Sequence, residues 1–170
     1  VLLIDRYGKY LLFHLESGQA MVAHMKMTGN FLLEPRSKKH ESSEKYIRFK
    51  IEFADGTKLL FSDIRKFGRI WLIPGSRLAE FFKERKMAYD ALSKLCTPAY
   101  LAGQLKKKRD VKTLLLDKTC VAGIGNIYAD EMLWHAKIHP LKKGEDLTEK
   151  EARILYQSMK VILNLGIRSG

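Results

Sequence analysis

The chain has 170 residues, 46% of them hydrophobic, which suffices for one sizeable domain or two small ones and argues against disorder. Lys and Arg number 31 against 19 Asp and Glu, so the net charge is +12, a balance typical of proteins that bind a polyanion such as nucleic acid. Cys96 and Cys120 lie outside any C-x-x-C pair and no long apolar run occurs, so we expect an intracellular protein with neither a disulfide framework, a zinc site within the chain nor a membrane span.

The first part of the chain has the pattern of short antiparallel strands. Residues 9–15 are apolar and strand-like, residues 16–18 contain a Ser-Gly turn, and residues 19–25 form a second apolar run. This order predicts a β-hairpin.

Three further strands are expected before residue 75. Residues 46–53 alternate apolar and polar side chains, which predicts one buried face. Asp55-Gly56 predicts a two-residue hairpin turn into a strand over 57–61, and residues 69–73 form another strand. The charged, serine-rich residues 35–44 predict a loop.

From residue 76 onward the apolar spacing becomes helical. Thr97 and Pro98 are suited to the N-cap and the first position of a helix, and Thr148 with Glu151 forms a capping box. Gly166 predicts the end of the last helix. The helices are expected over residues 76–86, 97–108, 111–116, 125–136 and 148–166.

This order of elements predicts an α+β protein and not a series of βαβ units. We expect a β-sandwich or barrel domain over residues 1–75, a linker over 76–96 and a helical domain over 97–170.

The most informative segment runs from Val121 to Glu131. Gly123 and Gly125 flank Ile124 just before a helix, where free backbone N–H groups and the helix dipole favour a phosphate, and Asn126 can add a side-chain donor. A glycine turn that merely starts a helix remains an equal alternative. Basic residues lie upstream and favour binding, although such a run can also be a solvated face: Lys106, Lys107, Lys108, Arg109, Lys112 and Lys118.

Three segments together resemble one known family. They are Val121-Ala-Gly-Ile-Gly-Asn-Ile-Tyr-Ala-Asp-Glu131 with Ile138-His-Pro140, His24-Met-Lys-Met-Thr-Gly29, and Asp63-Ile-Arg-Lys-Phe-Gly68. In sequence, order and spacing they resemble the formamidopyrimidine-DNA glycosylase/endonuclease VIII family, and the resemblance covers essentially the whole chain. Arginine and phenylalanine in the third segment favour the formamidopyrimidine-DNA glycosylase branch.

The resemblance implies an antiparallel β-sandwich followed by a helix–two-turn–helix DNA-binding module. It implies base-excision repair: binding of duplex DNA with oxidised or abasic sites, excision of 8-oxoguanine and formamidopyrimidines, and strand cleavage by β-elimination as an AP lyase. We expect a monomer without a membrane partner, cytoplasmic or nucleoid-associated in a bacterial-type cell.

The same resemblance assigns roles to individual residues. Met27, Arg65 and Phe67 fill the space left by an extruded base and contact its orphaned partner, although Met27 and Phe67 could instead be core residues and Arg65 a surface ion pair. His24 has a buried, satisfied imidazole as its alternative, and Glu131 a capping or surface role. The remaining DNA-binding residues implied are His24, Lys66, Lys112, Gly125, Asn126 and Tyr128, and Lys9 and Glu131 are implied to support catalysis.

The sequence departs from the family pattern at several points. The family's nucleophile is an N-terminal proline followed by glutamate, whereas residue 1 here is Val1, as if a first helix and strand were missing. The family's zinc lies in a C-terminal finger, which is expected beyond residue 170, so no cofactor is expected in the chain itself. Ile64 and Lys66 replace a proline and an arginine of the family's loop, and residues 87–93 replace a Gly-Pro-rich turn.

These departures predict a piece of a family enzyme, cut within regular structure at both ends and inactive as given. A reduced relative that only binds DNA is the alternative. A basic RNA- or ribosome-binding protein is a third possibility, but the aromatic sheet motif of common RNA modules is absent from the sequence.

Overall fold

The computed structural model describes residues 1–37 and 44–169, which divide into two compact units. Unit 1 comprises residues 1–6 and 10–76, and unit 2 comprises residues 7–9 and 77–170. Most of the loop predicted over residues 35–44 lies outside the described residues. Each unit is described by itself.

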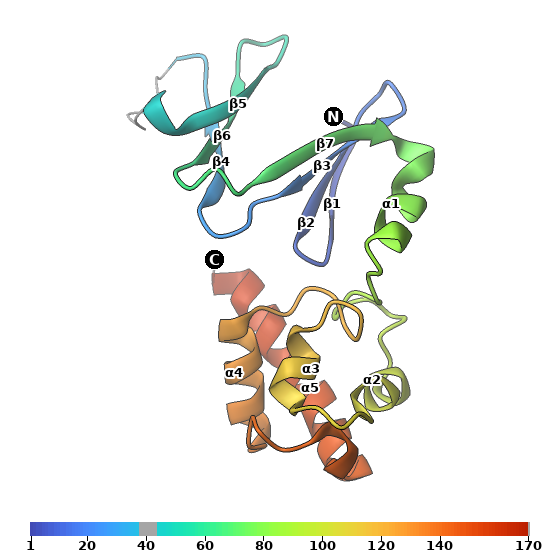
Figure 1. The fold of residues 1–170 in the computed structure, drawn as a ribbon. Helices are drawn as coiled ribbons and strands as arrows, with labels where there is room; N and C mark the ends of the chain where they lie inside the picture. The colour runs from blue at the N-terminus through green and yellow to red at the C-terminus, as the bar shows by residue number, and fades with distance from the viewer. Residues whose placement is uncertain (38–43, 170) are drawn as a thin grey trace. The chain divides into compact units, whose positions relative to one another are not determined.

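Unit 1 contains two antiparallel sheets, which Figure 1 shows as separate groups of strands. One sheet has the order β1-β2-β3-β7, with β1 at Leu3–Tyr7, β2 at Tyr10–His14, β3 at Gln19–His24 and β7 at Arg69–Pro74. The other has the order β4-β6-β5, with β4 at Gly29–Glu34, β6 at Lys58–Asp63 and β5 at Ile47–Glu52.

The core of unit 1 draws side chains from both sheets, which makes the unit a β-sandwich. Phe13 and Met21 of the first sheet are buried, and Phe31 and Ile51 of the second pack against them. The rings of Phe13 and Phe31 lie 5.4 Å apart between centroids. The predicted hairpin is present as β2 and β3, with Leu12 opposite Val22.

Two details of unit 1 differ from the expectation. The β5–β6 connection is longer than a two-residue turn, because the N–H of Gly56 donates to Phe53 O at 2.9 Å and the N–H of Phe53 donates to Thr57 O at 2.8 Å. Gly56 has φ 84°, as the extra residue of such a loop requires. Strand β5 has no buried residue, and Phe49 on it is 39% exposed, so its expected buried face is only partly covered.

Unit 2 is helical, and no helix among the described residues is long and apolar enough to span a membrane. Its core gathers buried side chains from four helices, including Leu101, Leu114, Met132 and Leu155, none of which is more than 1% exposed. The helices are α1 at Leu78–Glu84, α2 at Pro98–Leu105, α3 at Val111–Leu116, α4 at Asn126–Ala136 and α5 at Glu149–Ser169 (Figure 1). The predicted α+β class, a β-sandwich followed by a helical module, is therefore confirmed.

The capping signals predicted the helix starts correctly, but the predicted end of α5 is wrong. Thr97 Oγ1 accepts the N–H of Tyr100 at 3.1 Å, and Glu151 Oε2 accepts the N–H of Thr148 at 2.8 Å. The last helix continues through Gly166 to Ser169. A Cβ at Gly166 would lie 2.4 Å from Oη of Tyr128, so this glycine provides room for an aromatic ring of α4 and does not end the helix.

Candidate nucleic-acid interface

In unit 1 the carboxylate of Asp63 joins two loops that are distant in sequence. One loop is the turn between β3 and β4, and the other is the loop between β6 and β7. Asp63 is 1% exposed and accepts hydrogen bonds from Thr28 Oγ1 at 2.5 Å and from the N–H of Gly68 at 2.7 Å. The N–H of Arg65 donates to both Asp63 and Thr28, at 3.2 Å in each case.

These hydrogen bonds stabilise the charged form of Asp63. Burial by itself raises the pKa of a carboxyl group, but here the donors from Thr28, Gly68, Arg65 and Lys66 outweigh burial and hold the pKa of Asp63 below its ordinary value. The two loops are therefore tied together by an ionised carboxylate at neutral pH.

The loops joined by Asp63 carry three exposed large side chains in one cluster, which we name the wedge cluster: Met27, Arg65 and Phe67. Met27 is 71% exposed and Phe67 is 51% exposed, so neither is a core residue. The guanidinium of Arg65 donates to Met27 Sδ at 3.3 Å and lies 5.3 Å from the centroid of the Phe67 ring. The structure therefore brings together the three residues that the sequence assigned to one task.

The close approach of the two loops depends on two glycines over one buried ring. A Cβ at Gly29 would lie 2.8 Å from Cζ of Phe61, and a Cβ at Gly68 would lie 2.5 Å from the same atom. Phe61 is 3% exposed, so its ring cannot move aside into solvent. Any side chain at either glycine would push its loop away from the sandwich.

His24 and Lys66 lie at the ends of the same loops. His24 is half-buried, its Nδ1 accepts the N–H of Lys26 at 3.0 Å, and its ring meets Tyr10 edge-on at 4.7 Å between centroids. In the neutral imidazole this acceptor role leaves the proton on Nε2. Lys26 and Lys66 have backbone φ angles of 56° and 58°, which residues other than glycine rarely adopt, so both exposed lysines occupy turns of defined conformation.

In unit 2 the predicted glycine turn is present at the start of α4. Gly123 has φ 107°, Gly125 is the N-cap in extended conformation, and Asn126 is the first helical residue with an exposed side chain. A helix start leaves its first N–H groups without intrahelical acceptors, which suits an anion.

Lys9 lies beside this turn, held there through a buried carboxylate. Its Nζ is 3.4 Å from the position that a Cβ on Gly125 would take. The preceding residue, Gly8, donates its N–H to Asp90 Oδ2 at 2.8 Å, and Asp90 is 5% exposed. Asp90 also forms an isolated β-bridge with Ala122, directly before the glycine turn. One acidic residue therefore connects the Lys9 segment with the start of α4.

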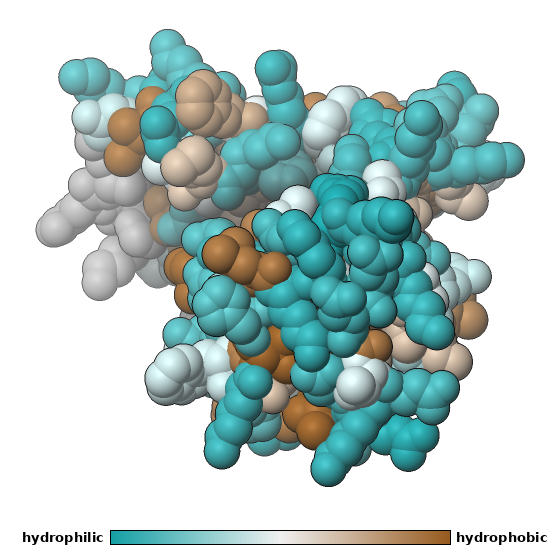
Figure 2. All heavy atoms as spheres, turned by 60° about the horizontal axis from the view of Figure 1, so that its bottom comes forward, coloured by the Kyte–Doolittle hydropathy of each residue, from teal (hydrophilic) through white to brown (hydrophobic). Residues whose placement is uncertain are grey.

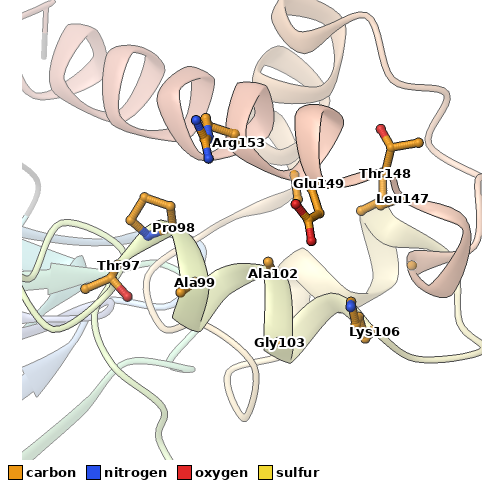
Figure 3. Close-up of a pocket in the computed structure, with 12 residues that line it drawn as sticks. Thr97, Pro98, Ala99, Ala102, Gly103, Lys106, Leu147, Thr148, Glu149 and Arg153 are labelled. Carbon is orange, nitrogen blue, oxygen red and sulfur yellow. The ribbon is translucent and has the colours of Figure 1, made fainter.

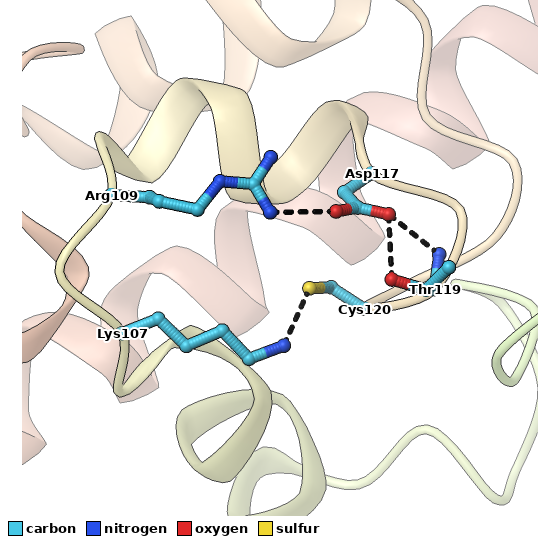
Figure 4. Close-up of polar contacts among 5 residues, drawn as sticks. All are labelled: Lys107, Arg109, Asp117, Thr119 and Cys120. Carbon is cyan, nitrogen blue, oxygen red and sulfur yellow. Dashed lines mark hydrogen bonds and ion pairs between the residues drawn. The ribbon is translucent and has the colours of Figure 1, made fainter.

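Two cations of the basic run upstream of α4 make polar contacts within unit 2, as Figure 4 shows. Arg109 forms an ion pair with Asp117 at 2.8 Å, and Lys107 donates to the buried Sγ of Cys120 at 3.1 Å. Hydrogen bonds from Thr119 and then from Arg109 lower the pKa of Asp117 to about 2. These cations therefore contribute to the fold as well as to the surface charge.

The remaining predicted residues lie along α3 and α4. Lys112 Nζ forms an ion pair with Asp130 at 2.7 Å, so a phosphate must compete with that carboxylate. Tyr128 is 38% exposed and packs against the backbone of Gly166. Glu131 is exposed and lines a hollow together with Trp134, which is 84% exposed.

A second hollow, of about 590 Å³, lies between α2 and the start of α5 (Figure 3). Its lining includes Lys106, Glu149 and Arg153 beside small apolar side chains, and none of the predicted site residues lines it. The helical surface in Figure 2 is mostly hydrophilic, with scattered apolar groups. Within residues 1–37 and 44–169 no three His, Cys, Asp or Glu side chains gather as metal ligands.

Comparison with known proteins gives one family over both units. Residues 1–70 match the family model of the formamidopyrimidine-DNA glycosylase N-terminal domain, and residues 87–170 match that of the formamidopyrimidine-DNA glycosylase H2TH domain. The chain is 39% identical over 168 residues to the formamidopyrimidine-DNA glycosylase of Ligilactobacillus salivarius and 40% identical over 157 residues to that of Lactiplantibacillus plantarum. These alignments cover 98% and 92% of this chain but 60% and 56% of the relatives, so the chain spans less than two thirds of their length.

Solved structures agree with the sequence comparison. The chain is similar to the Lactococcus lactis formamidopyrimidine-DNA glycosylase bound non-covalently to DNA that contains an AP site, with a TM-score of 0.87 and 32% identity over 97% of this chain and 62% of that one. A complex of the Lactococcus lactis protein with DNA that contains FAPY-dG gives the same TM-score and identity, with 61% of that chain covered.

Sequence reasoning missed two residues that organise the candidate interface, Asp63 and Asp90. Asp63 was noted only as the first letter of a resembling loop, and Asp90 only within a segment that departs from the family. Their hydrogen-bond partners Thr28 and Gly8 lie 35 and 82 positions away in sequence. No local pattern signals such partners.

Proposed function

The chain belongs to the formamidopyrimidine-DNA glycosylase family, and from that premise we propose that it serves base-excision repair by holding duplex DNA at an oxidised or abasic site. The observation that carries the proposal is the wedge cluster, in which Met27 and Phe67 remain exposed although both are strongly apolar. Exposed apolar side chains on rigid loops indicate a binding surface.

The proposed role of the wedge cluster follows from the geometry of the duplex. A base inside the stack cannot be reached by a nucleophile, so it must be extruded, and the vacated space must be filled. Met27 is flexible enough to fill an irregular gap, and Phe67 presents a flat face to a neighbouring base. Arg65, between them, carries the planar donors that the edge of the orphaned base can accept.

Phosphate contacts complete the proposed grip. In unit 1 we assign them to His24 and Lys66, and in unit 2 to Lys9, Asn126 and the N–H groups after Gly125. Such contacts fix the register on the duplex without reading its sequence, and a helix start provides the preorganised donors. Lys112 and Tyr128 are proposed as flanking contacts on the same module.

The proposed chemistry of the family enzyme is excision of oxidised purines such as 8-oxoguanine and formamidopyrimidines, followed by AP-lyase cleavage. An amine attacks the anomeric carbon, the damaged base leaves, a Schiff base forms and β-elimination breaks the strand. Lys9 and Glu131 are proposed as supporting residues for this chemistry. The family's zinc has no ligand cluster among the described residues, and no proposed step goes through it.

The proposed partner is duplex DNA in the nucleoid of a bacterial-type cell, bound by a monomer. The DNA partner in this proposal is supported by the relatives, since the Lactococcus lactis proteins were solved with DNA containing an AP site or FAPY-dG.

The test combines a gel shift with borohydride trapping on a polypeptide of these 170 residues. We expect tighter binding to a duplex with an abasic analogue than to the intact duplex, and no covalent adduct with 8-oxoguanine duplex because no N-terminal proline is present. An adduct would identify another amine, such as Lys9, as the nucleophile. Equal affinity for both duplexes, or a preference for RNA, would contradict the proposed function.

A further inference from the structure

Among the six methionines of the chain, Met27 alone is strongly exposed. It is 71% exposed, whereas Met21, Met132 and Met159 are at most 4% exposed and the other two, Met25 and Met87, are half-buried. All six lie within the described residues.

The thiols, which compete with methionine for oxidants, are shielded. Cys96 and Cys120 are both 0% exposed, and burial raises the pKa of Cys96, which keeps that thiol protonated. The thiolate and not the thiol is the reactive form of cysteine. Met27 is therefore the sulfur-containing residue most accessible to an oxidant in solution.

The sulfur of Met27 has a specific neighbour. Arg65 Nη1 donates to its Sδ at 3.3 Å, and the backbone N–H of Arg65 is held at 3.2 Å from both Asp63 and Thr28. The guanidinium is thus already positioned beside any oxygen atom that is added to this sulfur.

We propose that Met27 is a peroxide-sensitive modification site that switches the DNA grip of this protein off. The sulfur lone pair attacks one oxygen of hydrogen peroxide, the O–O bond breaks, and the departing hydroxide takes up the remaining proton to leave as water. Sulfur loses two electrons and becomes the sulfoxide, and the peroxide is reduced. Methionine sulfoxide reductases reverse this reaction, so the switch is reversible.

Two consequences of the oxidation weaken binding, and this step rests on the proposed function. The sulfoxide is polar, so its insertion between bases buries a group that has lost its contact with water. If the oxygen instead keeps Arg65 as its donor, in a charge-assisted hydrogen bond stronger than the one to the thioether, the sulfoxide is paired but Arg65 is held away from the orphaned base. Peroxide, a source of oxidised purines, would thereby weaken the binding of this chain to duplex DNA that contains such damage.

The experiment treats the full chain with limiting hydrogen peroxide and follows two measurements. Peptide mass spectrometry is expected to find one added oxygen, about 16 Da, on Met27 before any other methionine. The gel shift is expected to show roughly tenfold weaker binding to the abasic-analogue duplex, the modest end of the cost of burying an unpaired polar group, with little change for the intact duplex. Methionine sulfoxide reductase should restore the binding.

Two variants separate Met27 from its surroundings. In M27L the affinity, whatever its starting value, should not respond to peroxide, whereas M87L should keep the full response. Abasic-analogue duplex bound before treatment should protect Met27 from oxidation, because the inserted side chain is covered.

Oxidation of Met25 or Met87 ahead of Met27, an equal loss of binding in M27L, or unchanged binding by the sulfoxide would each overturn the proposal. If the untreated chain shows no preference for the abasic-analogue duplex, the proposed function fails and the switch fails with it. The order of oxidation, read by mass, distinguishes that result from a failure of Met27 itself.

Discussion

Replacing Asp63 with alanine should lower the stability of unit 1 and weaken the preference for abasic-analogue DNA. The stability of unit 2 should not change. The side chain is buried, and its carboxylate is the shared acceptor for the β3–β4 turn and the β6–β7 loop. D63A leaves Thr28 and the N–H of Gly68 without this acceptor, whereas the N–H of Arg65 keeps Thr28 Oγ1 as a partner.

The expected loss of stability follows from those two donors. A hydrogen bond to a charged group contributes about 1.5–3 kcal/mol, and a buried donor without a partner costs its full desolvation. The two contributions are not independent, so we expect a loss of about 3–4 kcal/mol, which leaves unit 1 folded but marginal. For a unit of this size, where each kcal/mol shifts the melting temperature by about 4–8 °C, the melting temperature should fall by roughly 12–32 °C.

The assay uses Trp71 of β7 as a reporter of unit 1. Trp134 of unit 2 is 84% exposed and is removed by W134F so that the emission reports one unit alone. The matched control is E16Q, which changes an exposed carboxylate of the same unit and should shift the free energy of unfolding by less than about 0.5 kcal/mol.

The DNA readout accompanies the melt. Because D63A frees the two loops, Met27 and Arg65 lose their shared geometry, and affinity for the abasic-analogue duplex should fall by more than affinity for the intact duplex. A loss of unfolding free energy below about 1 kcal/mol, together with an unchanged preference for the abasic analogue, would refute the reasoning.

Because the pKa of Asp63 is lowered in the folded state, the free energy of unfolding of unit 1 should decrease at acid pH. This pKa is lowered from the ordinary value of 3.8, so the contribution of the carboxylate is present above that pH and is lost as the pH falls below it. The asparagine side chain in D63N has no proton to gain in this pH range. The difference in unfolding free energy between the parent chain and D63N should therefore shrink at acid pH, and a constant difference would contradict the ionised state.

The remaining predictions concern unit 2. Gly166→Ala should destabilise it by about 1–3 kcal/mol, because the new Cβ would clash with Tyr128, whereas Gly103→Ala, which meets nothing within 4 Å, should stabilise it by about 0.5–1 kcal/mol in thermal or urea melts. Stabilisation by both would refute the packing role of Gly166. Lys9→Ala should reduce the steepness of log affinity against log salt by about 0.9 for abasic-analogue DNA, because one phosphate contact is lost. If Asp90 acts by positioning Lys9, the double variant with Asp90→Ala should lose little more affinity than Lys9→Ala alone.

Features that depend on neighbouring residues could be predicted from the sequence. Helix α3, Val111–Leu116, was predicted to the residue, and the caps at Thr97 and Thr148 were correct, because apolar spacing and capping act within a few positions. The wedge cluster was also predicted as a set, but through the family resemblance and not through the properties of Met27 or Phe67 themselves.

Features that depend on distant contacts could not be predicted. Strand β4, Gly29–Glu34, lacks a clear alternation and exists because it pairs with β6. Gly166 looked like a helix stop because the ring that fills the space beside it lies on another helix, 38 positions earlier at Tyr128. The ion pair of Lys112 with Asp130 could not be predicted either, because the fold brings together two residues 18 positions apart in sequence.

The buried side chains of Asp63 and Asp90 explain how basic side chains can hold defined positions on a strongly basic chain. Within the described part of the chain, Asp63 and Asp90 are the only charged side chains that are buried, although the net charge is +12. Each accepts backbone N–H groups from a turn that carries a predicted DNA contact, Arg65 in one unit and Lys9 in the other. Mutually repelling cations do not fix their own positions, whereas a desolvated carboxylate with several donors does. DNA affinity should therefore depend as much on these two acidic residues as on any single lysine.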